Sequence, residues 1–221
     1  DSDVNSSQVS CRIGTNNLQA GIKAAEAALA TDDEELYIGI VNYDVNSANG
    51  QQRELGFRQT VEQDPRVKNI TTINVLSTTE DARAGAKEML LSDSRINVVV
   101  TFNEWTSLGV GWAIRDLNRA DRIQVVAFDS NVVSVGMLET GEVDALIVQN
   151  PYAMGYLGVE TAANLMNGQT GGPSVVDTAT TIVTRENMYE PESQKILFSF
   201  WKRKCERINY RNVRMSRIGG Y

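Results

Sequence analysis

Three short polar side chains stand directly after apolar runs of the chain, where buried strands are expected to end. They are Asn103, Asp129 and Gln149, and the run before Asn103 is residues 98–100. An Asp carboxylate accepts hydrogen bonds from hydroxyl groups, while Asn and Gln amides both donate and accept them. In an open α/β sheet, ligands bind outside the carboxyl ends of the strands. This arrangement predicts a binding cleft for a small, neutral, hydroxyl-rich molecule.

The side chains of this cleft must be positioned by the strand-like and helix-like segments that alternate along the chain. The strand-like runs are nearly continuously apolar, which is typical of a parallel sheet covered by helices on both faces. We therefore predict an α/β fold, a Rossmann-like parallel sheet flanked by helices. Expected strands are residues 9–13, 36–41, 70–76, 98–100, 123–128, 143–148 and 179–183. Expected helices are residues 18–30, 51–63, 77–91 and 152–166, with a helical pattern also at 108–117 and a helical turn at 193–198.

Polar residues also mark where some of these helices begin. Asn16 or Asn17 precedes an Ala-rich helix and is suited to cap it, because Asn accepts hydrogen bonds from the first free backbone N–H groups. Ser77 and Glu80 have the spacing of a capping box at the start of the helix that ends near residue 91.

Composition and charge exclude several classes of function. The chain of 221 residues has a net charge of -7 and contains no His, the commonest general base and metal ligand. Positive charge is concentrated in residues 201–221, so the remainder is acidic, which disfavours nucleic acid as a partner. Cys11 and Cys205 have no metal-binding spacing, and a disulfide between them is left open. No apolar run approaches the roughly 18 residues of a transmembrane helix.

Several short segments, in their order and spacing, resemble the sugar-binding proteins of bacterial ABC transporters of the ribose- and galactose-binding type, which have the type 1 periplasmic binding fold. The resemblance covers roughly residues 1–198. It implies a non-enzymatic receptor for a monosaccharide or related polyol, without cofactor or metal, that serves a membrane permease from an extracytoplasmic position, as a periplasmic protein or a lipoprotein. The segments are Ile13-Gly14-Thr15-Asn16-Asn17, Arg53-Glu54-Leu55-Gly56-Phe57, Phe102-Asn103-Glu104, Val125-Val126-Ala127-Phe128-Asp129, Val148-Gln149-Asn150-Pro151 and Thr184-Arg185-Glu186-Asn187.

In that family two Rossmann-like lobes are joined by three crossing segments, and the sugar lies between the lobes. The resemblance implies that most of the first lobe is absent from this chain. The apolar side of the helix at 152–166 is then expected to pack against a partner chain or the missing lobe. The expected division is the end of the first lobe at 1–15, the second lobe at 16–149, a first-lobe segment at 150–176, a return to the second lobe at 177–198, and a basic tail outside the family at 199–221.

The resemblance assigns sugar binding to Asp1, Asn103, Asp129 and Gln149. Each side chain after a strand also has a purely structural interpretation. Asn103 is suited to cap a helix, Asp129 to form a turn at the end of a strand, and Gln149 to make a hinge hydrogen bond.

Other residues near these positions have open roles. Gln51 and Ser2 stand where the ribose-binding member of the family has Arg, so we expect a ligand other than ribose or an altered affinity. Trp105 follows Asn103 closely and is a candidate to bind the ligand by stacking on a sugar ring. The alternative is that Trp105 packs in a helix core. We expect Arg53 to be structural and to form an ion pair on the face of its own helix.

The sequence leaves other functions open besides the receptor. The first is the effector domain of a lac-repressor-type regulator, which shares this fold, and the second is the sugar-sensing domain of a membrane receptor. A glycosidase that uses Glu104 and Asp129 as its carboxylate pair is the weakest alternative, because no recognisable nucleophile motif accompanies them. The basic tail at 201–221 has the composition of a segment that binds a membrane surface or nucleic acid, or of a solvated or vector-derived extension.

Overall fold

The computed structural model describes residues 6–169 and 172–198, so Asp1, Ser2, Cys205 and the basic tail lie outside the described residues. The strands are β1 (Arg12–Thr15), β2 (Leu36–Asn42), β3 (Val67–Asn74), β4 (Val98–Thr101), β5 (Gln124–Phe128), β6 (Ala145–Val148), β7 (Val175–Thr178) and β8 (Thr181–Thr184). The helices are α1 (Asn17–Leu29), α2 (Ala48–Val61), α3 (Thr79–Ser92), α4 (Glu104–Leu117), α5 (Val132–Thr140), α6 (Pro151–Met166) and α7 (Pro191–Leu197).

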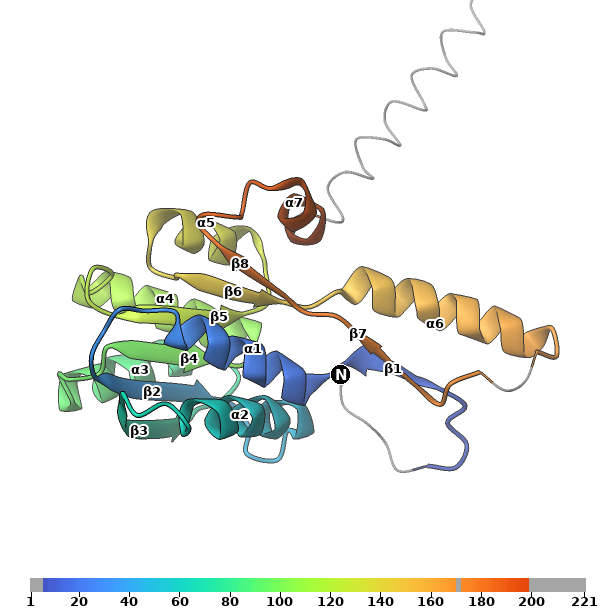
Figure 1. Cartoon of the computed structure of the whole chain (residues 1–221), viewed down its shortest axis with the longest axis horizontal. Helices are drawn as coiled ribbons and strands as arrows, with labels where there is room; N and C mark the ends of the chain where they lie inside the picture. The colour runs from blue at the N-terminus through green and yellow to red at the C-terminus, as the bar shows by residue number, and fades with distance from the viewer. Residues whose placement is uncertain (1–5, 170–171, 199–221) are drawn as a thin grey trace, which may run out of the picture.

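The strands form a main sheet of six and a small sheet of two. In the main sheet the order is β3-β2-β4-β5-β6-β8, and the small sheet pairs β1 with β7 (Figure 1). All neighbours in the main sheet are parallel except β8, which runs antiparallel to β6 with Ala145 opposite Thr184. The predicted parallel sheet is therefore confirmed apart from this edge. No helix intervenes between β7 and β8, and without such a crossover β8 enters the main sheet in the opposite direction.

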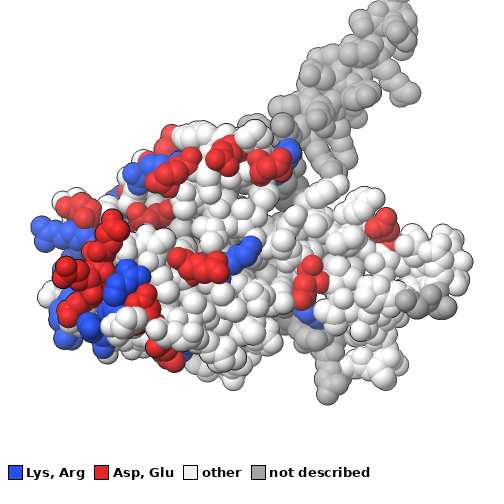
Figure 2. Space-filling view, in the orientation of Figure 1, with Lys and Arg blue, Asp and Glu red and all other residues white. Residues whose placement is uncertain are grey.

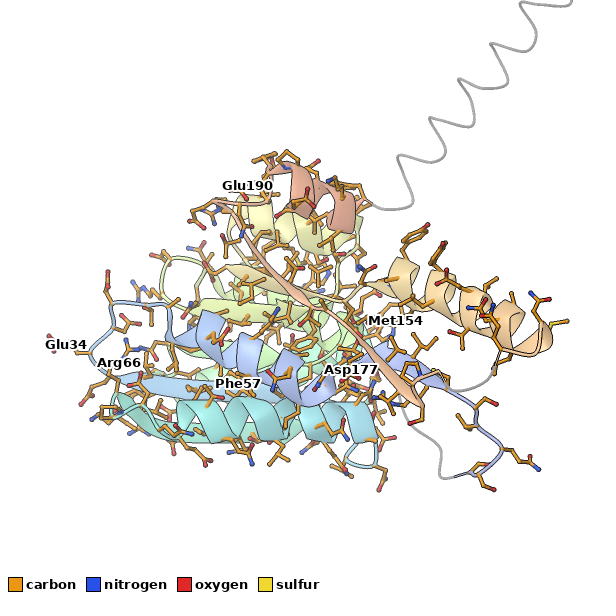
Figure 3. The ribbon with its side chains drawn as sticks, turned by 45° about the vertical axis from the view of Figure 1, so that its right-hand side comes forward. Glu34, Phe57, Arg66, Met154, Asp177 and Glu190 are labelled. Atoms are coloured by element: carbon orange, nitrogen blue, oxygen red, sulfur yellow. The ribbon has the colours of Figure 1, made fainter. Side chains whose placement is uncertain are left out.

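Helices cover both faces of the main sheet, as the apolar strands predicted. Side chains of successive strand residues point to opposite faces. In β4, Val98 and Val100 belong to the core cluster that contains residues of α1 and α2. Val99 belongs to the other cluster, with residues of α3, α4 and α5. Phe57 of α2, labelled in Figure 3, is fully buried in the first cluster.

The structure confirms one predicted helix cap, corrects another, and adds a strand near the end of the described chain. Asn16 caps α1 as predicted, because its side chain accepts from the backbone N–H of Gln19 at 3.1 Å. The capping box assigned to Ser77 and Glu80 was wrong. Thr78 is the cap of α3 and accepts from the backbone N–H of Asp81 at 3.2 Å. The strand expected at 179–183 is present as β8, whereas β7, which precedes it and belongs to the other sheet, was not expected.

Helix α6 extends away from the main sheet and lies beside the small sheet (Figure 1). None of its residues is buried, and Tyr156, Val159 and Met166 are 56%, 73% and 88% exposed. Charged side chains gather over the opposite end of the molecule, whereas the end that holds α6 shows few of them (Figure 2). Within the described ranges, no helix combines the length and apolarity that crossing a membrane requires.

Candidate functional site

Asp129 and Gln149 meet at the carboxyl ends of two neighbouring parallel strands. Asp129 follows β5 and Gln149 follows β6, and the amide Nε2 of Gln149 donates a hydrogen bond to Asp129 Oδ1. Asp129 adopts a left-handed backbone conformation with φ of 67°, which Asp tolerates better than most residues. Both side chains line a pocket of about 310 Å³, together with Glu104 and Met154 among others. The pocket thus presents a carboxylate and an amide side by side.

The orientation of the Gln149 amide is set from its other side. Its Oε1 accepts from Thr15 Oγ1 at 2.6 Å and from Arg53 Nη2 at 3.0 Å. With Oε1 engaged by these donors, Nε2 faces Asp129. Neither Thr15 nor Arg53 was among the residues to which sequence reasoning assigned ligand binding.

Arg53 lies beneath the site and is only 1% exposed. Its Nε donates to Asn17 Oδ1 at 2.9 Å and its Nη1 to the main-chain oxygen of Phe102 at 2.7 Å. Its guanidinium carbon lies 4.9 Å from the centre of the Phe128 ring. Burial lowers the pKa of this guanidinium, and the nearby Asp129 is one of the groups that oppose this shift.

The expectation that Arg53 pairs on the surface of its own helix was wrong. Arg58 makes that ion pair, with Glu54 at 2.8 Å. A signal for the burial of Arg53 was present, because it stands four residues before Phe57 and eight before Val61, both fully buried. Residues at this spacing share one helix face.

The electrostatic environment of Asp129 differs from that of a surface carboxylate. Burial raises the pKa of the Asp129 carboxyl above its ordinary value of 3.8, while the hydrogen bond from Gln149 and the charge of Arg53 partly lower it. Glu104 raises it further by repulsion, and the Glu104 carboxylate itself accepts from Asn131 Nδ2 at 2.6 Å.

Asn103 lies at the end of β4, next to β5, but its side chain is engaged within the protein. Its Oδ1 accepts from the backbone N–H of Thr106 at 2.9 Å, which caps α4, and its Nδ2 donates to Ser77 Oγ at 2.7 Å. It is not among the residues that line the pocket of Asp129 and Gln149. Asn103 therefore caps α4, which is the structural interpretation given for it from the sequence.

Two further predicted site residues, Trp105 and Gln51, are not among those that line the pocket. Trp105, in the first turn of α4, is 50% exposed rather than packed in a helix core. Gln51 is exposed on α2 and donates through Nε2 to the main-chain oxygen of Val45. The structure thus brings Asp129 and Gln149 into contact and leaves Trp105 and Gln51 apart from them.

The chain passes between its two sheets near this pocket, and the passing segments are bonded to one another. Thr15 at the end of β1 reaches Gln149 after β6, as described above. Thr178 at the end of β7 donates to the main-chain oxygen of Gly14 at 3.1 Å. Asp177, labelled in Figure 3 near Met154 at the base of α6, pairs with Arg12 at 3.0 Å. Side-chain contacts therefore hold together, beside the site, the segments that join β1 to α1, β6 to α6, and β7 to β8.

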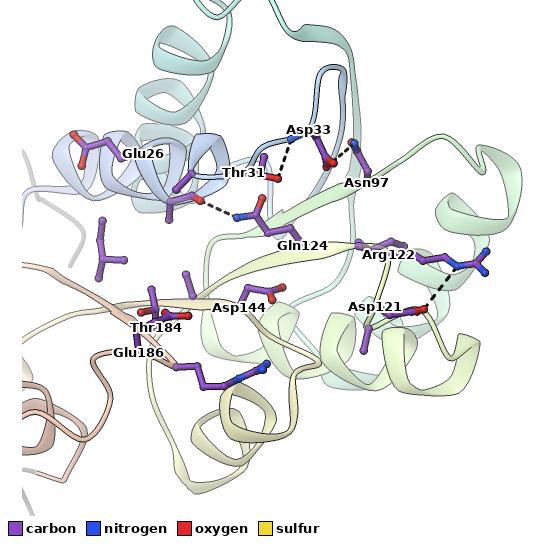
Figure 4. Close-up of a pocket in the computed structure, with 17 residues that line it drawn as sticks. Glu26, Thr31, Asp33, Asn97, Asp121, Arg122, Gln124, Asp144, Thr184 and Glu186 are labelled. Atoms are coloured by element: carbon purple, nitrogen blue, oxygen red, sulfur yellow. Dashed lines mark hydrogen bonds and ion pairs between the residues drawn. The ribbon is translucent and has the colours of Figure 1, made fainter.

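A larger hollow of about 740 Å³ lies at the opposite edge of the main sheet, where the strands begin (Figure 4). Its polar side chains make bonds within the chain. Gln124 Nε2 donates to the main-chain oxygen of Ala27 at 2.9 Å, and Asp144 accepts from the backbone N–H of Val125 at 2.7 Å. In the described part of the chain, no group of three His, Cys, Asp or Glu side chains is arranged to hold a metal ion.

Comparison with known proteins places the chain in a family. Residues 1–170 match the model of the periplasmic binding protein domain, and the chain belongs to this family. A D-ribose/D-allose-binding protein of Pseudomonas aeruginosa is 28% identical over 150 residues, which cover 66% of this chain and 47% of that protein. The chain therefore spans about half the length of this relative.

Solved structures agree with this membership. A carbohydrate transporter solute-binding protein of Agrobacterium radiobacter, in complex with D-arabinose, matches with a TM-score of 0.84 and 28% identity, covering 89% of this chain and 68% of that one. The periplasmic component of an ABC-type sugar transport system from Hahella chejuensis matches with a TM-score of 0.78 and 30% identity, covering 83% and 68%.

Proposed function

We propose that this protein is the solute-binding component of an ABC-type sugar importer and that Asp129 and Gln149 bind hydroxyl groups of the sugar. The observation that carries the proposal is the contact between these two side chains at the mouth of a pocket at the carboxyl ends of β5 and β6. A carboxylate that accepts and an amide that donates together match a hydroxyl group, which needs both. Membership in the periplasmic binding protein family and the sugar-transport relatives support the same function.

The two-lobed arrangement is part of this proposal. The main sheet would form the second lobe, from residue 16 to 149 with the return at 177–198, and β1, α6 and the start of β7, up to residue 176, would belong to the first lobe. The separate two-stranded sheet and the wholly unburied α6 support this division. Sugar would be held between the lobes, and the closed form would engage a membrane permease outside the cytoplasm.

A thermal-shift and calorimetric screen tests the function. The protein is titrated with D-ribose, D-allose, D-arabinose, D-fucose and D-tagatose. A ligand at 100 times its Kd stabilises the folded state by about 2.7 kcal/mol. We expect at least one sugar to raise Tm, and we expect Asp129→Asn to reduce that rise. Asp144→Asn, which alters a carboxylate at the opposite edge of the sheet, is the matched control and should bind normally. If no monosaccharide shifts Tm or releases heat, the proposed function is wrong.

A further inference from the structure

We infer that Arg53 is a positioning residue that makes Gln149 present only N–H donors to the pocket and thereby determines which ligand groups the site accepts. The inference rests on the proposed function, because it concerns the same pocket. It adds a role for a residue that does not line that pocket.

Arg53 makes a contact beside the carboxyl end of each of three neighbouring strands, β4, β5 and β6. Its Nη1 donates to the main-chain oxygen of Phe102, beside Asn103, at 2.7 Å. Its guanidinium lies over the ring of Phe128, the residue before Asp129. Its Nη2 donates to Gln149 at 3.0 Å. The single buried side chain of Arg53 therefore connects the carboxyl ends of β4, β5 and β6.

The chemistry of these contacts allows only one orientation of the Gln149 amide. A guanidinium carries only donors, so a flipped amide would place its N–H groups against the N–H groups of Arg53. The flip would also place Oε1 against the carboxylate of Asp129, which is acceptor against acceptor. The hydroxyl of Thr15 can either donate or accept, so it would adapt to both orientations. Arg53 on one side and Asp129 on the other therefore select the same orientation, and Arg53 is the group that holds Oε1.

This orientation has a consequence for the ligand. One N–H of Gln149 is engaged by Asp129, and the second remains for a ligand acceptor. A hydroxyl group placed between the two side chains donates to Asp129 and accepts from Gln149. A sugar with hydrogen in place of that hydroxyl would leave the second N–H of Gln149 without an acceptor and Asp129 without the donor that the hydroxyl supplies, which disfavours its binding. Arg53 therefore contributes to selectivity for the hydroxylated sugar without touching it.

The test compares the affinities of a bound sugar and its mono-deoxy analogues in the wild-type protein, Arg53→Lys and Thr15→Val. Lys keeps the charge but lacks the fork of donors that reaches both Phe102 and Gln149. In Arg53→Lys we expect the affinity for the sugar to fall at least tenfold and the ratio between the sugar and the discriminated analogue to shrink. In Thr15→Val we expect that ratio to be kept. A role in helix packing alone would weaken all ligands by one factor, and an unchanged ratio in Arg53→Lys would overturn the inference.

A measurement on the wild-type protein covers the case in which Arg53→Lys does not fold. In NMR spectra, the Nε2 protons of Gln149 should show contacts with Asp129 and not with the methyl group of Thr15. The opposite pattern would overturn the inference. If the wild-type protein binds no sugar, the proposed function fails, while the NMR result still decides the orientation of the amide. If sugar binds and Asp129→Asn weakens binding, but the ratio is unchanged in Arg53→Lys, only the role of Arg53 fails.

Discussion

Gly21 of α1 lies directly against the backbone of Arg53 in α2. A Cβ atom at Gly21 would stand 2.0 Å from the main-chain oxygen of Arg53, closer than real Cβ contacts approach. Gly56 has the reciprocal relationship, because its Cβ would lie 2.2 Å from the main-chain oxygen of Leu18. The two helices therefore touch backbone to backbone. This close approach sets the depth at which the Arg53 guanidinium reaches the strand ends.

Substitution of Gly21 by Ala should disturb both stability and binding. Overpacking of a close contact typically costs about 1–3 kcal/mol, so Gly21→Ala should lower the free energy of unfolding by that amount in urea titrations. Sugar affinity should fall with it, because α2 must move and carries Arg53. Gly136→Ala is the matched control. A Cβ at Gly136 in α5 meets nothing within 4 Å, and Ala favours the helix by up to about 1 kcal/mol. Equal stability of Gly21→Ala and wild type would contradict the close packing.

Asp129 should bind ligand at the expense of stability. Burial raises its pKa in the folded state, so its contribution to stability is fully present below pH 3.8 and is lost as pH rises through the raised pKa. Asn carries no charge and tolerates the left-handed backbone. Asp129→Asn should therefore unfold at a higher temperature than wild type at neutral pH, and the difference should vanish toward pH 3.8. Calorimetric scans at several pH values provide the measurement.

The same substitution should weaken sugar binding. A hydrogen bond to a charged group contributes about 1.5–3 kcal/mol, which corresponds to about a 10- to 100-fold loss of affinity. An Asp129→Asn protein that binds sugar normally would show that the carboxylate is not part of the site. If Asp129→Asn instead has a lower Tm than the wild-type protein at neutral pH, burial of the Asp129 carboxylate does not oppose folding.

Asn103 offers a separation of capping from ligand binding. Asn103→Ala removes the cap of α4 and should cost about 1 kcal/mol, whereas Asn103→Asp keeps an acceptor for the Thr106 N–H and should lose less. Urea titrations of both variants check this order. If Asn103 also binds sugar, Asn103→Asp should weaken binding while it retains most of the stability. Equal affinity of Asn103→Asp and wild type would restrict Asn103 to the cap.

The exposed apolar side of α6 should drive association of the 221-residue chain on its own. Large contiguous apolar patches on soluble proteins usually mark interaction surfaces. We expect sedimentation velocity to show concentration-dependent self-association that Val159→Lys reduces. Val132→Lys is the control, since Val132 is 78% exposed but lies on α5. If the chain stays monomeric at high concentration, or if Val132→Lys reduces self-association as much as Val159→Lys does, α6 is not the surface through which the chains associate.

The amino-acid sequence alone was sufficient for the fold class and for the residues at the strand ends. Apolar runs that stop at short polar residues carry local information, because period, run length and turn residues are properties of neighbouring positions. Asp129 and Gln149 were identified in this way. The family resemblance is confirmed by the match of residues 1–170, whereas sugar contacts at the individual residues stay predictions.

Only the tertiary structure decided how these residues are held. Thr15 and Gln149 are 134 positions apart, and Arg53 and Gln149 are 96 apart, so no local pattern connects them. The unexpected strand β7 likewise depends on the tertiary structure, because it forms by pairing with the distant β1 rather than with the main sheet. The spacing of Arg53 from Phe57 and Val61 indicates its helix face, but the acceptors that make its burial tolerable come from distant segments and are brought together only by folding.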